Sequence, residues 1–245
     1  MYDEFNSMYD DWMIETELEI QKTFVAKDMY RCVERKYSEV DNEKLNHFYD
    51  RALTTHQKLI MMMFAKWNFH KAKDEFEGTQ NMNIPALYGM GNTMIVFYIE
   101  SMIVFARNAL DVSAKIYGDI LLERDIDSFN KFSKYILRST REEFKDLKQY
   151  FIEQGESSLS AFRLLCGSER GRALRDVIIH QANVRLEYHE YKENSEKEHL
   201  FLILKDISPI DIEWFVAYFV DAVEEIFEQT TLCCERILMK KSLVD

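Results

Sequence analysis

The sequence Met94-Ile-Val-Phe-Tyr-Ile-Glu-Ser-Met-Ile-Val-Phe-Ala106 is the most apolar stretch of this chain. It contains only 13 residues, and Glu100 lies in its middle. A helix that crosses a bilayer needs about 20 apolar residues, so this stretch predicts a buried core helix and not a membrane span. We expect the helix to begin at Asn92 or Thr93 and to stop at Gly118, because glycine commonly ends helices.

The composition favours long helices. The chain has 245 residues, of which 47% are hydrophobic and 13% aromatic, so it can bury a core and is not a disordered chain. It contains only 7 glycines and 2 prolines, the residues that most often break helices and form turns. An all-α fold with few sharp turns is therefore expected.

Apolar side chains keep helical spacing on both sides of the central stretch. Thr140 and Glu143 have the spacing of a capping box for one further helix, and Ser157 or Ser158 is a candidate cap for another. A loop is expected over residues 78–91. The expected helices cover residues 14–36, 41–78, 126–137, 140–154 and a short stretch that ends at Cys166.

A β-hairpin is expected to interrupt the helices. Val184, Leu186 and Tyr188 alternate with polar residues, a pattern that is typical of a strand. Residues 194–197 are polar and predict a turn, and residues 199–204 predict the return strand.

A long terminal helix follows the hairpin. Pro209 is expected to start it, because proline is favoured in the first turn of a helix. Its predicted buried side consists of Trp214, Phe215, Tyr218, Phe219, Ala222, Val223, Ile226 and Phe227.

Cysteine usage and the first residues indicate a cytoplasmic protein. The four cysteines show no disulfide or metal spacing, so we expect reduced thiols in a core. The chain opens with acidic residues, without the basic and apolar regions of a signal peptide. The cysteines are Cys32, Cys166, Cys233 and Cys234.

A short basic helix is predicted at Arg170-Gly-Arg-Ala-Leu-Arg-Asp-Val-Ile-Ile-His-Gln-Ala-Asn-Val-Arg185. Within it, Arg175-Asp176-x-x-x-His180 supplies the groups that cleave a phosphodiester. His180 can take a proton from a ribose 2′-hydroxyl near neutral pH. Arg175 can fork onto the phosphate and hold the charge that develops there. Asp176 lies four residues before His180, on the same helical face, and can orient the imidazole.

The local charge of this region is opposite to that of the whole chain. The formal net charge is -12, so the chain as a whole is not expected to bind nucleic acid by a broad electrostatic surface. Residues 163–185 instead carry five arginines against Glu169 and Asp176, and arginine is suited to bidentate phosphate recognition. The candidate phosphate or RNA ligands beside Arg175 are Arg163, Arg170, Arg172 and Arg185.

Helix geometry favours a dimer. Each residue turns a regular helix by about 100°, so residues five apart are separated by roughly 140°. Arg175 and His180 therefore do not share a face. A two-fold homodimer in which both copies contribute these residues to one cleft would resolve this, and the site would then be composite.

The Arg-polar-x3-His pattern at Arg175, Asp176 and His180 resembles the signature of the HEPN superfamily, which consists of all-α domains found in many bacterial and archaeal RNases, toxins and defence proteins. The resemblance implies a HEPN-like helical bundle over residues 79–245, with one small β-hairpin before the C-terminal helix. Residues 1–78 would form a helical extension packed on this domain.

The resemblance also implies an activity. HEPN nucleases are homodimers that cleave RNA without a metal, with the histidine as general acid or base and the arginine as phosphate ligand. It implies RNA as the substrate, a toxin or antiviral role, and an antitoxin or other regulatory protein as a possible partner. We expect no cofactor, no metal ion and no membrane association.

Two other interpretations remain open. Arg175 and His180 are alternatively surface residues of an amphipathic helix, with Asp176 as their ion-pair partner. The chain is alternatively a non-catalytic helical module that binds a nucleotide or a protein, which its overall acidity favours.

Other constellations give weaker signals. Arg107, Asp111 and Lys115 have i, i+4 spacing, which predicts surface ion pairs or support for the motif helix. Glu196 and His199 have the spacing of a di-iron ligand pair, but such sites need a second pair and further glutamates. Glycine-rich phosphate loops and Gly-x-Ser-x-Gly elbows are absent from the sequence.

Overall fold

The computed structural model describes Glu34 and residues 42–79, 85–156, 160–166, 185–190, 198–203 and 209–242. The described residues are mostly helical and include one small antiparallel sheet. The predicted all-α fold with a hairpin is confirmed at this level. The helix expected over residues 14–36 lies outside the described residues, apart from Glu34.

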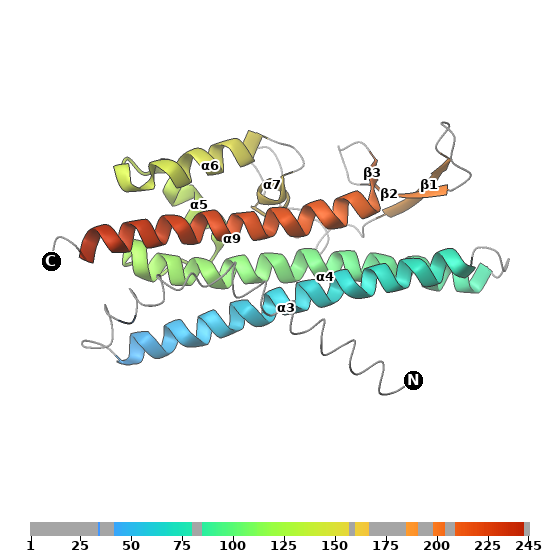
Figure 1. The fold of residues 1–245 in the computed structure, drawn as a ribbon, viewed down its shortest axis with the longest axis horizontal. Coiled ribbons are helices and arrows are strands. Elements are labelled where there is room, and N and C mark those ends of the chain that lie inside the picture. Colours follow the sequence, from blue (N-terminus) through green and yellow to red (C-terminus); the bar gives the residue numbers. More distant parts are fainter. Residues whose placement is uncertain are drawn as a thin grey trace.

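Three long helices form the body of the described fold (Figure 1). They are α3 (Asn42–Thr79), α4 (Pro85–Tyr117) and α9 (Ile212–Ser242). The chain runs in opposite directions along α3 and α4, and α9 runs in the same direction as α4 (Figure 1). Helix α4 contacts both of the others. Its central apolar side chains are fully buried, namely Ile95, Ile99, Met102, Ile103 and Ala106.

The prediction of a core helix is therefore confirmed for one side of residues 94–106, whereas Met94 and Phe97 of the same stretch are 42% and 58% exposed. The stretch Thr93–Leu122 is long and apolar enough to cross a membrane by length and composition alone. That is weak support for a membrane span, because the core helix of a soluble protein has the same properties. In this fold the stretch packs against α3 and α9.

The ends of α4 differ from the prediction. The helix begins at Pro85, because proline is pre-organised for the first helical turn, and not at Asn92 or Thr93. Gly118 does not stop it: a π-helical turn, Gly118–Leu122, continues to Glu123, whose φ of 52° ends the helix. Position 118 needs glycine because other atoms of the chain lie too close to leave room for a side chain. An added Cβ would lie 2.7 Å from Ile126 Cγ1 and 2.8 Å from a backbone oxygen.

Short helices cover α4 and α9 on one side, namely α5 (Phe129–Arg138), α6 (Lys145–Glu156) and α7 (Ala161–Cys166). Their shared core is aromatic. The ring centroid of Phe151 lies 5.0 Å from that of Phe162 and 5.8 Å from that of Phe129. Aromatic pairs in this range add to the stabilisation from buried area.

The predicted caps of these helices were partly wrong. The backbone before α6 forms a 3-10 helix, Glu142–Phe144, whose N-cap is Arg141. Glu143 therefore occupies the second helical position, so it cannot complete a capping box with Thr140, and it pairs with Arg141 instead. Helix α6 also continues through Gly155 to Glu156.

Helix α7 is capped by Ser160, whose Oγ accepts a hydrogen bond from the backbone N–H of Arg163 at 3.1 Å. The candidate caps Ser157 and Ser158 lie outside the described residues. Cys166, Cys233 and Cys234 are buried free thiols, as predicted, and burial raises the pKa of Cys233 to about 11. Cys32 lies outside the described residues.

The predicted hairpin is confirmed by β1 (Arg185–Glu190) and β2 (Glu198–Ile203), which pair antiparallel with Tyr188 opposite Leu200. A short third strand, β3 (Ile210–Asp211), pairs with β2 and was not predicted. Asp211 Oδ1 accepts a hydrogen bond from the backbone N–H of Trp214 at 2.9 Å. Because Asp211 caps the helix, α9 begins at Ile212 and not at Pro209.

The buried side of α9 differs from the predicted one, because it also includes Ile212, Val216 and Val220 and excludes Trp214. Phe215, Phe219, Ala222, Val223, Ile226 and Phe227 are buried as expected. Trp214 is 49% exposed, because it lies about 160° around the helix from the buried Val216 and outside the buried side. It stacks on Tyr218, with ring centroids 4.8 Å apart.

The close approach at Gly118 gives a testable prediction. Gly118→Ala should destabilise the protein by about 1–3 kcal/mol, the typical cost of overpacking, although alanine is the better helix former. The melting temperature should fall by about 2–4 °C per kcal/mol in a protein of this size. Gly155→Ala in α6 is the matched control, since nothing lies within 4 Å of its added Cβ. An equal or higher melting temperature for Gly118→Ala would contradict the close contact.

Candidate functional site

Most of the predicted site lies outside the described residues. This holds for Arg170, Arg172, Arg175, Asp176 and His180, all within residues 167–184. Their predicted roles stay predictions.

The structure describes both flanks of this segment. Arg163 is a half-buried residue of α7, and Arg185 is the first residue of β1, opposite Ile203. Both α7 and β1 contact α4. The chain therefore enters and leaves the motif segment on the surface of the central helix.

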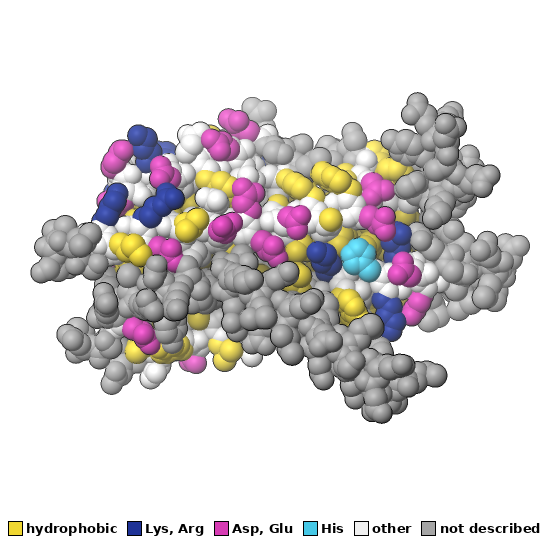
Figure 2. All heavy atoms as spheres, in the orientation of Figure 1, with side chains coloured by type: hydrophobic (Ala, Val, Ile, Leu, Met, Phe, Trp, Pro, Cys, Tyr) yellow, Lys and Arg dark blue, Asp and Glu magenta, His cyan; other side chains and the backbone are white. Residues whose placement is uncertain are grey.

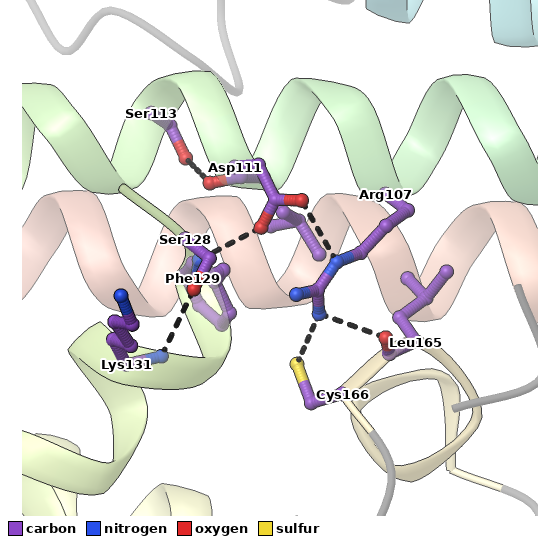
Figure 3. A network of polar contacts seen from close by, with 9 residues as sticks. Arg107, Asp111, Ser113, Ser128, Phe129, Lys131, Leu165 and Cys166 are labelled. Carbon is purple, nitrogen blue, oxygen red and sulfur yellow. Dashed lines mark hydrogen bonds and ion pairs between the residues drawn. The ribbon is translucent and has the colours of Figure 1, made fainter. Parts of the chain in front are cut away.

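A buried arginine fixes the point where the chain enters the segment (Figure 3). Arg107 of α4 is 8% exposed. One of its terminal nitrogens donates a hydrogen bond to the carbonyl oxygen of Leu165 at 2.8 Å and contacts Cys166 Sγ at 3.4 Å. Its Nε donates to Asp111 Oδ2 at 3.0 Å. The guanidinium thus joins the last residues of α7 to the middle of α4.

Asp111 extends this network to α5. Its second carboxylate oxygen accepts a hydrogen bond from the backbone N–H of Phe129 at 2.8 Å. Ser128 accepts from the backbone N–H of Lys131 in the same turn. The first N–H groups of a helix have no partner within the helix, and a carboxylate there is stabilising. One ion pair on α4 therefore holds the start of α5 and the end of α7.

The prediction of surface ion pairs at these positions was wrong for Arg107. Helices α5 and α7 cover this side of α4, so the Arg107–Asp111 pair is largely withdrawn from water. Within the described residues, Lys115 forms no ion pair with Asp111. The alternative expectation, a supporting role beside the motif helix, stays a prediction, because that helix lies outside the described residues.

Cys166 is not a candidate nucleophile. Burial raises the pKa of its thiol to about 12, and the neighbouring positive charge of Arg107 offsets this only in part. A thiol with this pKa is protonated at neutral pH, and the thiolate is the reactive form. Cys166 is a packing residue beside the guanidinium.

Sequence reasoning missed a second basic cluster. Lys131, Lys134 and Arg138 of α5, with Arg141 just beyond it, line one open pocket. The spacing of three and four residues between Lys131, Lys134 and Arg138 is the signal that could have found the helical part of this cluster, because such residues share one side of a helix.

In the described part of the chain, no three His, Cys, Asp or Glu side chains are grouped as metal ligands. Comparison with protein-family models, with curated proteins and with solved structures finds no match for this chain. The HEPN resemblance therefore depends on the motif at Arg175, Asp176 and His180 alone.

The Arg107 network gives the second prediction. Arg107→Ala leaves the half-buried carboxylate of Asp111 and the buried carbonyl of Leu165 without this donor, which should cost up to about 3–5 kcal/mol, the typical loss when a buried pair is broken. The melting temperature should fall on the order of 10 °C, measured by circular dichroism. Arg236→Ala is the control, because Arg236 forms an exposed pair with Asp146 at 3.0 Å, and such pairs contribute about 0–1 kcal/mol. Equal losses for both variants would show that burial of the Arg107 pair has no special effect.

Proposed function

We propose that this protein is a metal-independent endoribonuclease of the HEPN type. The observation that carries the proposal is the sequence Arg175-Asp176-x-x-x-His180, located in an arginine-rich segment of an acidic, mostly helical chain. A toxin or antiviral role, a cytoplasmic location and an antitoxin partner are part of the same proposal.

The three residues would divide the chemistry as follows. His180 accepts the proton of a ribose 2′-hydroxyl, and that oxygen attacks the adjacent phosphorus. The bond from phosphorus to the 5′-oxygen breaks, and the leaving oxygen takes up a proton. The products are a 2′,3′-cyclic phosphate and a 5′-hydroxyl, so the reaction needs no metal-bound water. Arg175 stabilises the charge on the phosphate oxygens, and Asp176 orients the imidazole.

The described scaffold supports this proposal at the flanks of the segment. Catalytic groups must be held by residues whose own positions are fixed. The Arg107 network holds the end of α7, and the paired strands β1 and β2 hold the other flank. The segment that carries Arg175 and His180 is therefore bounded on both sides by ordered contacts with the core.

A homodimer is part of the proposal, because Arg175 and His180 do not share a helical face. An apolar stripe on α3, consisting of Leu53 and Phe64, offers a surface for a second copy. These side chains are 58% and 40% exposed, and eleven residues of helix place them about 20° apart. Trp67 extends the stripe by its ring contact with Phe64. A long helix with a second apolar side is expected to pack against another helix.

The alternative function is a non-catalytic helical module that binds a nucleotide or a protein. The net charge of -12 favours it, because an acidic surface repels RNA at long range. Binding without any cleavage would distinguish this module from a nuclease.

Substitutions in the motif test the nuclease proposal on purified protein with mixed RNAs. His180→Ala should lower the cleavage rate by about 10²–10⁴-fold through loss of acid–base catalysis. Arg175→Ala should cost about 10²–10³-fold, and Arg175→Lys should restore little, because an ammonium cannot fork onto a phosphate. Asp176→Asn should have a smaller effect than either.

The melting temperature provides the control for these variants. Residues that line a solvent-open cleft can be replaced with little effect on stability, so all variants should melt near the wild type. Intact cleavage together with strong destabilisation would mean that the three residues form a structural network and not a catalytic site.

The oligomeric state is tested by light scattering on a size-exclusion column. The wild type should have twice the chain mass of 29.3 kDa, and Leu53→Glu with Phe64→Glu should yield the monomer, because charges on an apolar interface are strongly unfavourable. Ile152→Glu is the control, since Ile152 is an exposed apolar residue of α6. A wild-type monomer at micromolar concentration would remove the composite site.

A further inference from the structure

The junction of α5 and α6 carries an open pocket of about 520 Å³. Four of its seven lining side chains are the cations Lys131, Lys134, Arg138 and Arg141, and none is acidic. Thr140 adds a hydroxyl group to the lining. This pocket is basic, although the chain as a whole carries a net charge of -12.

The packing of α5 places these cations together. Phe129, Phe132 and Ile136 are fully buried on one side of the helix. Lys131, Lys134 and Arg138 follow at intervals of three and four residues, so they lie on the opposite side. Burying the aromatic side necessarily turns the three cations toward solvent.

Two of the cations lack a compensating carboxylate. Lys131 pairs with Asp127 at 2.5 Å, and Arg141 pairs with Glu143. Among the described residues, Lys134 and Arg138 form no ion pair. Like charges four residues apart on a helix repel each other, and an anion bound between them would remove this cost.

We propose that this pocket binds the phosphodiester backbone of single-stranded RNA. The choice of RNA depends on the proposed function, whereas the recognition of phosphate follows from the lining residues. Arg138 can fork onto phosphate oxygens, Lys134 supplies a second charge and Thr140 can donate a hydrogen bond.

The shape of the cluster favours a polymer over a single small anion. Lys131 and Arg138 are seven residues apart, which corresponds to about 10 Å along the helix. Successive phosphates of a strand can occupy this length, whereas one phosphate cannot. The pocket is also open at the surface, so a chain can pass through it.

The pocket lies on α5, and the Arg107–Asp111 pair connects α5 with the end of α7, where the chain enters the motif segment. Asp111 holds the first turn of α5, and its partner Arg107 holds Leu165 at the end of α7.

The face formed by α9 is unsuited to the same role. Figure 2 shows acidic side chains spread along this face. Asp221, Glu225 and Glu228 are exposed residues of α9. RNA is repelled there, so the basic pocket on α5 is the favoured contact in the described part of the chain.

Fluorescence polarisation with a labelled 12-nucleotide oligouridine tests the site. The His180→Ala protein is used as the background so that the RNA stays intact. Adding Lys134→Gln and Arg138→Gln should raise the Kd on the order of tenfold at 50 mM salt. The slope of the logarithm of the binding constant against the logarithm of the salt concentration should become shallower by about 1.4, which is about 0.7 for each lost phosphate contact of a single strand. The melting temperature should not fall, because the substitutions remove a like-charge pair. Lys66→Gln with Lys71→Gln on α3 is the control for the same loss of charge.

Three results would overturn the proposal. The first is an unchanged Kd in the α5 variant, and the second is an equal loss of affinity in the α3 control. The third is competition by uridine monophosphate or inorganic phosphate that is as effective as competition by unlabelled oligouridine at equal phosphate concentration. The last result would assign the pocket to a small phosphate.

Cleavage by the wild type separates this proposal from the proposed function. RNA binding that depends on Lys134 and Arg138 without any cleavage would retain the site and reject the nuclease. Cleavage and binding that are both unaffected by the α5 substitutions would reject the site and retain the nuclease.

Discussion

The ion pair between the buried Arg107 and the half-buried Asp111 is the interaction on which the arrangement of the short helices depends. Several neighbours of this pair on α4, namely Ala106, Ala109 and Leu110, are apolar and fully buried, so two charges at this position need partners from other parts of the chain. Arg107 donates a hydrogen bond to the carbonyl oxygen of Leu165, and Asp111 accepts one from the backbone N–H of Phe129. Removing charges from water is costly unless their hydrogen bonds are satisfied. The pair therefore specifies where α5 begins and where α7 ends.

This constraint connects the core with both candidate functional regions. The end of α7 leads into the segment with Arg175 and His180, and α5 presents the basic pocket. Each region carries positive charge on a body with a net charge of -12. An acidic body disfavours non-specific contacts with nucleic acid, so RNA would be bound only where cations are concentrated.

The sequence predicted those features that depend on local patterns. The span of α3, the buried side of residues 94–106 and the pairing of β1 with β2 follow from apolar periodicity. Features that depend on contacts between distant residues were predicted less well. Gly118 indicated a helix stop, whereas the structure needs glycine there because Ile126 approaches its Cα. Arg107 has the i, i+4 spacing of a surface pair, and only the packing of α5 and α7 reveals its burial.

The candidate functional residues likewise divide into those that a local sequence pattern indicates and those that only the folded structure reveals. Arg175, Asp176 and His180 were found from a sequence motif, and no contact among the described residues includes them. The basic side of α5 was present in the spacing of Lys131, Lys134 and Arg138, but the pocket also needs Arg141, which lies beyond the helix. Arg141 lies in the turn between α5 and the next helix. Periodicity within one helix therefore does not predict that Arg141 lines the pocket.

Analysis of RNA fragment ends by mass spectrometry tests the central claim most directly. Purified protein is incubated with RNA in the presence of EDTA, and the ends of the fragments are identified. Attack by the 2′-hydroxyl predicts 2′,3′-cyclic phosphate and 5′-hydroxyl ends, formed by the wild type and not by His180→Ala. Fragments that appear only after addition of magnesium or manganese and carry 5′-phosphate ends, or an absence of cleavage, would contradict it.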